Sequence, residues 1–155
     1  MVKNMNEKEK WMKEALKQAN LALKKDEVPI GCVIVKNHHI IARAYNKRET
    51  FQQSIAHAEI LAIEKACRKL DTWRLEDCDL YVTVEPCPMC AGAIIQSRIK
   101  NVYYGASDSK GGCVESVTNL FLMKEFNHHP SYESGILKEE CSSLLKEFFK
   151  SKRNK

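Results

Sequence analysis

The sequence predicts an α/β fold in which a central sheet lies between layers of helices. Short runs rich in β-branched residues alternate with longer stretches whose apolar residues recur at helical spacing, and a turn joins the first two runs. The chain has 155 residues, 44% hydrophobic and 29% charged, which suits one soluble domain over residues 1–155. No window approaches the apolar length of a membrane span, so we expect no membrane contact.

The first predicted helix begins near residue 6. Asn6 followed by Glu9 matches a capping box, in which side chains satisfy the first backbone amides of a helix. The apolar residues that follow recur at helical spacing: Met12, Ala15, Leu16, Ala19, Ala22 and Leu23. Pro29 and Gly31 are incompatible with a continuing helix, so we expect the helix to end before them.

A β-hairpin is predicted next. Residues 30–35 form an apolar, β-rich run that is too short for a helix and fits a buried strand. Asn37 and His38 favour a turn, and residues 40–44 return as the antiparallel partner.

The middle of the chain alternates between helix and strand. We expect a helix over residues 57–70, with these core candidates: Ile60, Leu61, Ile63 and Ala66. A strand over residues 80–84 follows. Pro88 suits the first turn of a helix, where its missing N–H costs little, and that helix is expected to reach residue 98. The fourth strand is predicted over residues 102–105.

The last third of the chain begins with a polar loop over residues 107–113. A helix over 116–126 and a short strand over 132–134 are predicted after it. A final amphipathic helix is indicated by apolar residues at helical spacing: Leu137, Cys141, Leu144, Leu145 and Phe148.

Positive charge is concentrated at the C-terminal end. The net charge of the chain is +5, and the last ten residues carry five basic side chains against the single acidic Glu147. A basic end can attract a polyanion such as RNA. It can equally be a solvated tail that only aids solubility, and charge alone favours this second interpretation.

Two short blocks carry residues suited to metal chemistry, His57-Ala58-Glu59 and Pro86-Cys87-Pro88-Met89-Cys90. Cys87 and Cys90 share one side of a first helical turn, where unpaired backbone amides favour thiolates. His57 would be the third ligand, which leaves a fourth position for water, as in catalytic zinc sites. Glu59 lies on another side of its helical turn and is suited to moving protons. This pairing is the signature of zinc-dependent nucleobase and nucleoside deaminases.

Simpler interpretations of the Cys-x-x-Cys motif are a structural zinc site and a redox pair. A structural site needs four protein ligands, and Cys113 or Cys67 would have to complete it. A redox pair needs neither His57 nor Glu59. We expect the five scattered cysteines to be reduced, as in a cytoplasmic protein: Cys32, Cys67, Cys78, Cys113 and Cys141. The sequence assigns them no role.

The segments around the motif resemble bacterial tRNA-specific adenosine deaminases over nearly the whole chain. The matching segments are residues 28–31, 73–75, 80–94, 97–99, 104–108 and 135–137, together with Asn46 and the helix around Cys141. The metal motif itself is shared with guanine, cytosine and other small-molecule deaminases. These flanking segments therefore favour the tRNA enzyme.

The resemblance implies a three-layer cytidine deaminase-like fold with a central five-stranded mixed sheet. It also implies a homodimer that converts adenosine to inosine at the wobble position of a tRNA anticodon stem-loop. It implies one Zn²⁺ per chain, bound by His57, Cys87 and Cys90, with Glu59 as the catalytic acid and base. Four residues would bind the substrate, and Asn46 among them would hydrogen-bond the flipped adenosine: Asn46, Ala58, Pro86 and Asp108.

Several of these residues have a simpler interpretation. Asn46 follows a strand and also suits a turn, and Asp108 lies in a polar loop where an acidic residue is ordinarily solvated. In the basic C-terminal helix and tail, the candidate RNA contacts are Lys150, Lys152 and Arg153.

Aromatic residues near these segments are expected mainly to pack. We expect Trp73 and Arg74 to pack between a helix and a strand, and one ring of Phe148 and Phe149 to lie in the core. The other ring could stack on an RNA base.

The chain departs from the family pattern after residue 127. It has His128 and His129 where the family commonly has His-Arg, and the loss of that arginine puts one possible RNA or structural contact in doubt.

Two other functions stay open from the sequence. A small-molecule deaminase acting on guanine or cytosine would keep the zinc chemistry but have little use for the basic end. A non-enzymatic, zinc-stabilised RNA-binding protein would tolerate loss of Glu59, so the presence of this residue argues against it.

Overall fold

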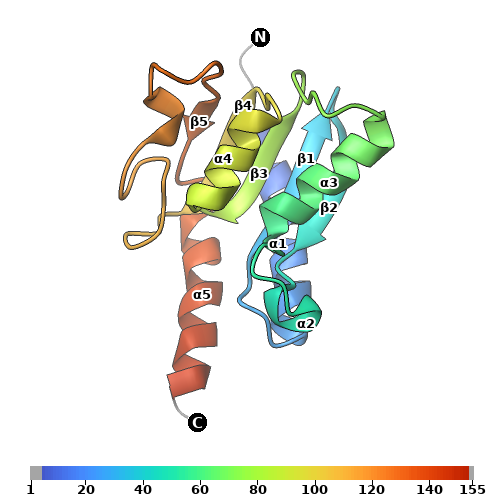
Figure 1. Ribbon diagram of the computed structural model, residues 1–155. Helices are drawn as coiled ribbons and strands as arrows, with labels where there is room; N and C mark the ends of the chain where they lie inside the picture. The colour runs from blue at the N-terminus through green and yellow to red at the C-terminus, as the bar shows by residue number, and fades with distance from the viewer. Residues whose placement is uncertain (1–4, 154–155) are drawn as a thin grey trace.

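The protein forms a five-stranded mixed sheet between two layers of helices. We describe residues 5–153 of a computed structural model (Figure 1). The strands are β1 (Gly31–Lys36), β2 (His39–Tyr45), β3 (Asp79–Val84), β4 (Asn101–Ala106) and β5 (Ser131–Glu133), in the spatial order β2-β1-β3-β4-β5. The pairs β1–β2 and β1–β3 are antiparallel, whereas β3–β4 and β4–β5 are parallel. This confirms the predicted hairpin and the five-stranded mixed sheet.

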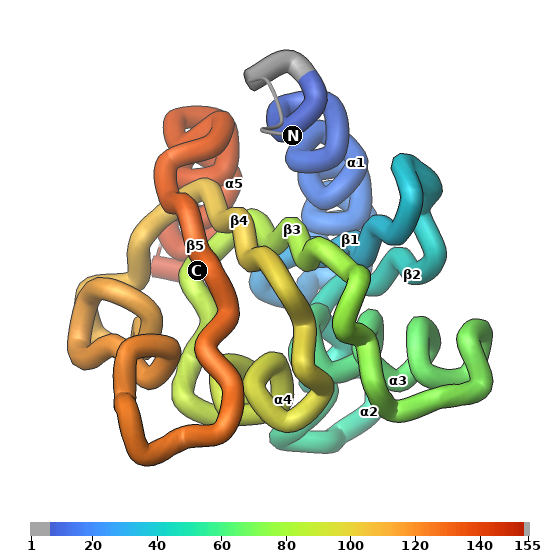
Figure 2. Tube along the Cα trace, turned by 90° about the horizontal axis from the view of Figure 1, so that it is seen from above, coloured from blue at the N-terminus to red at the C-terminus, as the bar shows by residue number. Residues whose placement is uncertain are grey.

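Two helices cover each face of the sheet. Figure 2 shows α1 (Met5–Lys24) and α5 (Lys138–Arg153) on one side, and α3 (Ala58–Leu70) and α4 (Pro88–Gln96) on the other. Successive strand residues alternate between two apolar clusters, as the two-residue period of a strand requires. Val33 packs with α1, for example, whereas its neighbours Cys32 and Ile34 pack in the cluster that includes α3 and α4.

Helix α1 lies unusually close to the sheet at Gly31. A Cβ atom on this residue would lie 2.1 Å from the carbonyl oxygen of Ala15 and 2.4 Å from the backbone nitrogen of Ala19. Only glycine therefore fits at the start of β1. The predicted apolar stripe of α1 meets the sheet here, since Ala15 and Ala19 are fully buried.

The predicted cap of the first helix is wrong, whereas the helix does end before Pro29, as expected. Asn6 lies within α1, which begins at Met5, so it is not the N-cap residue. The helix ends at Lys24, five residues before Pro29. Asp26 adopts a left-handed conformation, and the amide of Glu27 bonds back to the carbonyl of Ala22. This local turn, and not the proline, ends the helix.

The predicted helix over residues 116–126 is also wrong. Only a single 3-10 turn is present, η1 (Leu120–Leu122). The amides of Val114, Glu115 and Ser116 donate to the side-chain carboxylate of Glu85, at 2.8–3.1 Å. Farther along the segment, the amides of Val117 and Leu120 bond to the carbonyls of Gly112 and Cys113, and that of Phe121 bonds to the Asn119 side chain. These amides therefore do not form a helical ladder.

One short helix escaped the sequence analysis. Helix α2 (Arg48–Phe51) is only four residues long and has no buried residue, so it carries no apolar stripe. None of the described helices is both long and apolar enough to cross a membrane.

Candidate metal and active site

The residues of the metal motif lie at the starts of two neighbouring helices. His57 is the N-cap residue of α3, and Cys87 is the N-cap residue of α4, with Pro88 in the first turn. Both N-cap residues have extended backbones, and both helices begin near the same end of the strands of the sheet (Figure 1). The fold thus brings together two blocks that are about thirty residues apart in the chain.

The three candidate ligands have the spacing of a tetrahedral zinc site. Nδ1 of His57 lies 3.6 Å from Sγ of Cys87 and 3.6 Å from Sγ of Cys90, and the three ligand atoms all lie within 4.8 Å of one another. Tetrahedral bonds of about 2.3 Å to sulfur and about 2.0 Å to nitrogen place nitrogen and sulfur about 3.5 Å apart. The residues therefore fit a zinc ion and form a group that could bind a metal.

No fourth protein ligand joins this group among the described residues. The thiol of Cys113 donates instead to the carbonyl of Gly111, and the thiol of Cys67 to the carbonyl of Trp73. All seven cysteines fall within residues 5–153, and none forms a disulfide. The structure thus argues against a closed structural site completed by Cys113 or Cys67.

Mutual hydrogen bonds set the protonation of the three ligands. The Cys90 thiol lowers the pKa of Cys87 to about 4, and the neighbouring His57 adds to this effect. The same bond raises the pKa of Cys90, and burial raises it further. Hydrogen bonding to Cys87 raises the pKa of His57. The lowered pKa of Cys87 favours the thiolate that a metal site requires, and the protons on the other members of the cluster would leave when a cation binds.

Glu59 lies beside the cluster in the first turn of α3. Its side chain is buried, and burial raises its pKa to about 7, with the Cys87 thiolate acting in the same direction. A carboxyl group with a pKa near neutrality can both accept and donate a proton. The positive charge of a bound cation would act in the opposite direction.

A small pocket opens against Glu59. Its lining comes from the loop before β1, the residues after β2, the start of α2 and the start of α3: Val28, Ile30, Asn46, Arg48, His57, Ala58 and Glu59. Sequence reasoning named four of these residues and missed Val28, Ile30 and Arg48. The backbone amide of Ala58 is the first in α3, so no carbonyl of that helix can accept from it.

Asn46 has a turn role in addition to its place in the pocket. Its side-chain oxygen accepts from the amide of Arg48 at 3.1 Å, and its side-chain nitrogen donates to the carbonyl of Val28 at 3.4 Å. The loop that follows Asn46 is held by buried Glu27, whose carboxylate accepts from the amides of Glu49 and Thr50 at 3.1 and 2.6 Å.

Pro86 and Asp108 lie outside the lining of this pocket. The carbonyl of Pro86 accepts from the amide of Cys113 at 2.9 Å. The carboxylate of Asp108 accepts from the amides of Lys110 and Gly111, at 3.2 and 3.1 Å, so it organises its own loop. Both residues contact the same loop, residues 108–116, which the structure ties to the start of α4.

Glu85 connects that loop to the metal motif, and sequence reasoning missed it. It lies between β3 and Pro86 and is 3% exposed. Burial by itself would raise the pKa of Glu85, but hydrogen bonds from Glu115, Ser116 and Asp108 outweigh it and lower the pKa. The available sequence signal was an acidic residue placed between a mostly apolar strand and a metal-binding motif.

The candidate RNA contacts at the C-terminal end differ in their surroundings. Lys150 and Arg153 are exposed. Nζ of Lys152 lies 2.6 Å from a carboxylate oxygen of Asp26, so this lysine joins α5 to the loop after α1. A groove runs alongside, lined by Lys25, Asp26, Val28, Arg48, Glu49, Thr50, Phe148, Phe149 and Lys152. It shares Val28 and Arg48 with the pocket at Glu59. As expected, Phe148 is buried, while Phe149 is exposed.

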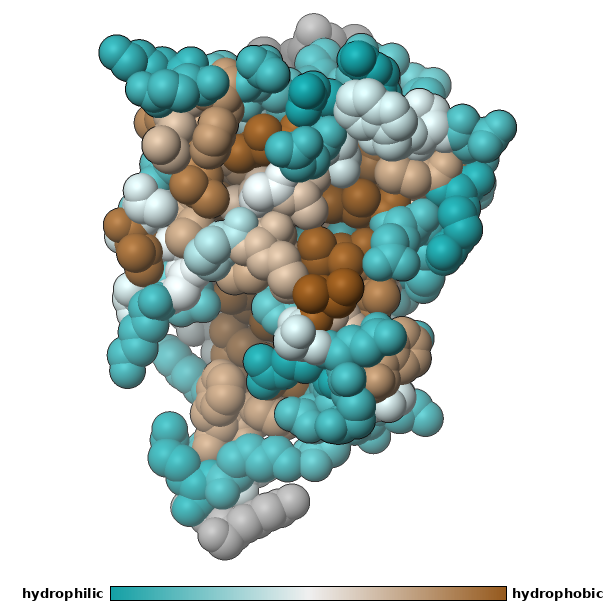
Figure 3. Space-filling view, viewed as in Figure 1, coloured by the Kyte–Doolittle hydropathy of each residue, from teal (hydrophilic) through white to brown (hydrophobic). Residues whose placement is uncertain are grey.

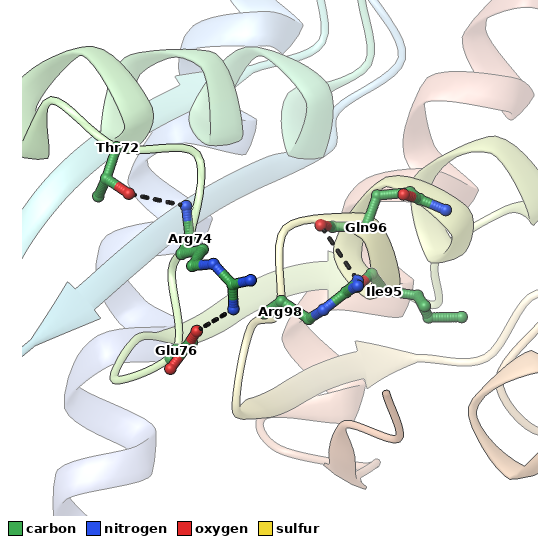
Figure 4. Close-up of polar contacts among 6 residues, drawn as sticks. All are labelled: Thr72, Arg74, Glu76, Ile95, Gln96 and Arg98. Atoms are coloured by element: carbon green, nitrogen blue, oxygen red, sulfur yellow. Dashed lines mark hydrogen bonds and ion pairs between the residues drawn. The ribbon is translucent and has the colours of Figure 1, made fainter. Parts of the chain in front are cut away.

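The expected packing of Trp73 between a helix and a strand is wrong. Its side chain is 55% exposed, and the guanidinium groups of Arg74 and Arg98 lie 4.6 and 5.8 Å from the ring centroid. The two arginines come from different loops, as Figure 4 shows: Arg74 also pairs with Glu76, and Arg98 donates to the carbonyl of Ile95. The tryptophan thus joins these loops at the surface.

His128 and His129 bind backbone within the protein. A ring nitrogen of His128 bonds to the carbonyl of Ile99 at 2.6 Å, and a ring nitrogen of His129 bonds to the carbonyl of Phe121 at 2.9 Å. Both histidines therefore hold the loop before β5, which is a structural role.

Comparisons with known proteins agree with the fold and the site. Residues 6–153 match the family model described as MafB19-like deaminase. The tRNA-specific adenosine deaminase of Bacillus subtilis (strain 168) is 55% identical over 151 residues, covering 97% of this chain and 94% of the relative. That of Rickettsia bellii (strain RML369-C) is 50% identical, covering 92% of this chain and 100% of the relative.

Solved structures give the same result. A structure from a study of A-to-I editing by tRNA:A34 deaminases is 45% identical, with a TM-score of 0.85 over 88% of this chain and 99% of the other. Guanine deaminase from Bacillus subtilis is 34% identical, with a TM-score of 0.61 over 75% of this chain and 85% of the other.

The fold and the His/Cys/Cys site together define a deaminase. Within that class, the chain belongs to the family of tRNA-specific adenosine deaminases.

Proposed function

We propose that the protein is a zinc-dependent hydrolase that converts adenosine to inosine at the wobble position of tRNA anticodons in the cytoplasm. The observation that carries this proposal is the 55% identity, over 97% of the chain, to a protein named tRNA-specific adenosine deaminase. The cluster of His57, Cys87 and Cys90 beside Glu59 supports it, because its donor set is that of zinc deaminases.

Nδ1 of His57 and the thiolates of Cys87 and Cys90 would hold one Zn²⁺ per chain. When bound, zinc supplies a Lewis acid that makes a water molecule acidic near neutral pH. The thiolates lie at a helix N-terminus, where backbone amides stabilise negative charge.

Glu59 moves the protons of the reaction. It takes one from the attacking water and passes it to a ring nitrogen. It later takes the second proton from the new hydroxyl group on C6 and passes it to the departing amine. The water oxygen bonds to C6, the bond from C6 to the amino nitrogen breaks, and the products are inosine and ammonia. Asn46 and the Ala58 amide orient the base in the pocket, and the Pro86 carbonyl faces the departing amine.

The anticodon stem-loop is the substrate form that we propose. An adenine must leave its stack before it can enter a pocket of this kind. The groove beside the pocket offers Phe149 as a stacking surface, and Lys150, Lys152 and Arg153 lie at the same end of α5. Asp108 would accept from the ribose hydroxyl of a neighbouring nucleotide.

We further propose that the protein is a homodimer. Figure 3 shows hydrophobic side chains exposed across the middle of the face that carries α3 and α4. Several large apolar residues on the loops around these helices are exposed: Ile55, Val117, Leu122, Met123 and Phe126. Apolar surface of this kind favours association. Light scattering after gel filtration should give a mass near twice 17.8 kDa.

A substrate panel tests the proposed reaction. The zinc-loaded protein should form inosine from an anticodon stem-loop with adenosine at the wobble position. The matched RNA with guanosine there should give no product, and free adenosine, guanine and cytidine should be poor substrates. Rapid turnover of guanine with none of the RNA would instead establish a small-molecule deaminase. RNA binding without deamination of any panel member would favour the non-enzymatic alternative.

A further inference from the structure

Glu85 is a buried acidic residue for which the proposed chemistry gives no direct task. It lies at the end of β3, two residues before Cys87, and its side chain reaches into the loop over residues 108–116. The backbone of Glu85 is also bonded to the sheet, because its amide donates to the carbonyl of Ala106 in β4 at 2.9 Å. Its backbone is therefore fixed by the sheet, and its carboxylate is fixed by the loop.

The two carboxylate oxygens of Glu85 together hold both ends of the loop. Oε2 accepts from the amides of Val114, Glu115 and Ser116, at 3.1, 2.8 and 2.9 Å. Oε1 accepts from the amide of Asp108 at 3.0 Å and from the hydroxyl of Ser116. A charged acceptor makes each of these bonds stronger than a neutral one would.

The loop is shaped to approach this carboxylate. A Cβ atom on Gly112 would lie 2.2 Å from Cδ of Glu85 and 2.4–2.6 Å from its oxygens. No side chain fits there. The neighbouring amide of Cys113 bonds to the carbonyl of Pro86, the residue that follows Glu85. The loop thus contacts Glu85 and Pro86 at successive positions, immediately before the metal ligand Cys87.

We propose that Glu85 is a positioning residue, which fixes the backbone of Asp108, and thereby its carboxylate, and the Pro86 carbonyl relative to the start of α4. The inference rests on the proposed function, because it assigns these two groups to substrate binding. Glu85 itself touches neither the substrate nor the metal. Its effect should therefore appear mainly in substrate affinity, through the placement of the loop.

The substitution Glu85→Gln tests this with little change of shape. The amide oxygen of glutamine can still accept from Val114, Glu115 and Ser116. Its NH₂ group then faces the Asp108 amide, where two donors meet and no hydrogen bond forms. We expect KM for the anticodon stem-loop to rise about tenfold, the effect of losing one hydrogen bond to a charged group, with kcat changed by less than about threefold. Zinc content should stay at one per chain.

Amide hydrogen exchange supplies a readout that needs no substrate. In Glu85→Gln, the Asp108 amide should exchange at least about tenfold faster than in the unaltered protein, while the amide of Glu115 keeps most of its protection. The matched control is Glu115→Gln, which removes the same charge from the same loop but leaves every acceptor on Glu85 in place. Glu115→Gln should leave KM and Asp108 exchange unchanged.

Gly112→Ala provides a second variant in case Glu85→Gln folds poorly. It keeps the charge of Glu85 but displaces the loop from the carboxylate, so it should reproduce both the rise in KM and the faster exchange at Asp108.

Unchanged exchange at Asp108 in both variants would overturn the proposal, and so would loss of zinc with an unaltered loop. If the unaltered protein forms no inosine, the proposed function fails, whereas the exchange measurement still decides whether Glu85 holds the loop.

Discussion

The groups proposed for the reaction and those proposed for the substrate are held by different means. His57, Glu59, Cys87 and Cys90 lie in the first turns of α3 and α4, whose inner faces pack on the sheet. Their relative placement follows from two helices on a sheet. Asn46, in contrast, belongs to an irregular segment, which has no repeating hydrogen-bond pattern of its own and depends on long-range contacts.

Two buried carboxylates provide these contacts for the two loops. Glu27 holds the segment after Asn46 through two backbone amides. Glu85 holds the Asp108 loop through four backbone amides and a hydroxyl. The larger number of bonds at Glu85 indicates a more rigid loop on that side of the site. The chemistry is thus built on regular elements, and the substrate contacts depend on buried charges.

The largest effect is expected on kcat, from a change in the residues that α3 and α4 carry. Glu59→Gln removes the proton carrier but none of the three candidate ligands, so zinc content should stay at one per chain. The loss of kcat should be about 10²–10⁴-fold, the usual contribution of general acid–base catalysis. Single-turnover assays with saturating RNA measure it, and metal analysis of the same sample is the control. Substantial remaining turnover would remove Glu59 from its assigned role.

The same difference between regular elements and loops decides which residues could be predicted from the sequence. The four residues of the chemical core fall in two local blocks, and spacing along the chain was enough to find them. The same holds for the strands and for α3 and α4, whose apolar patterns are periodic. The predicted helix over 116–126 failed because amides inside it bond elsewhere: that of Leu120 to the distant carbonyl of Cys113 and that of Phe121 to the side chain of Asn119.

The missed residues have the same explanation. Glu27 and Glu85 act through backbone amides more than twenty residues away, and no local pattern marks such a contact. Arg48 enters the pocket because the loop after β2 folds back, and the four-residue helix that carries it has no apolar stripe. Trp73 lies at the surface because two arginines from separate loops cover its faces.

A smaller effect, on KM, is expected when the segment after Asn46 is held less firmly. Glu27→Gln leaves one acceptor oxygen for the amides of Glu49 and Thr50, so one of these two hydrogen bonds is removed. Because Asn46 lies just before this segment, KM for the stem-loop should rise about threefold to tenfold, with zinc content unchanged. The control is Glu64→Gln, which removes an exposed acidic charge from α3, outside the lining of the pocket and the groove. If Glu27→Gln raises KM more than Glu85→Gln does, the number of bonds is not what sets loop rigidity here.

The smallest effect is expected at the C-terminal helix, where the contacts are electrostatic. In a variant with Lys150→Gln and Arg153→Gln, two exposed charges are removed and the Lys152–Asp26 pair is kept. If both side chains neutralise phosphates of the RNA loop, the slope of log affinity against log salt should flatten by about 1.4, or about 0.7 for each phosphate that is no longer neutralised.

The control for this variant is Lys10→Gln with Lys13→Gln, which removes two exposed charges from the first half of α1. Figure 1 shows that the start of α1 and the end of α5 lie at opposite ends of the molecule. Its salt slope should match that of the unaltered protein. Equal slopes for all three proteins would mean that Lys150 and Arg153 do not contact RNA and are only solvated charges at the end of α5. In that case, RNA affinity would have to come from the groove and from the two loops that Glu27 and Glu85 hold.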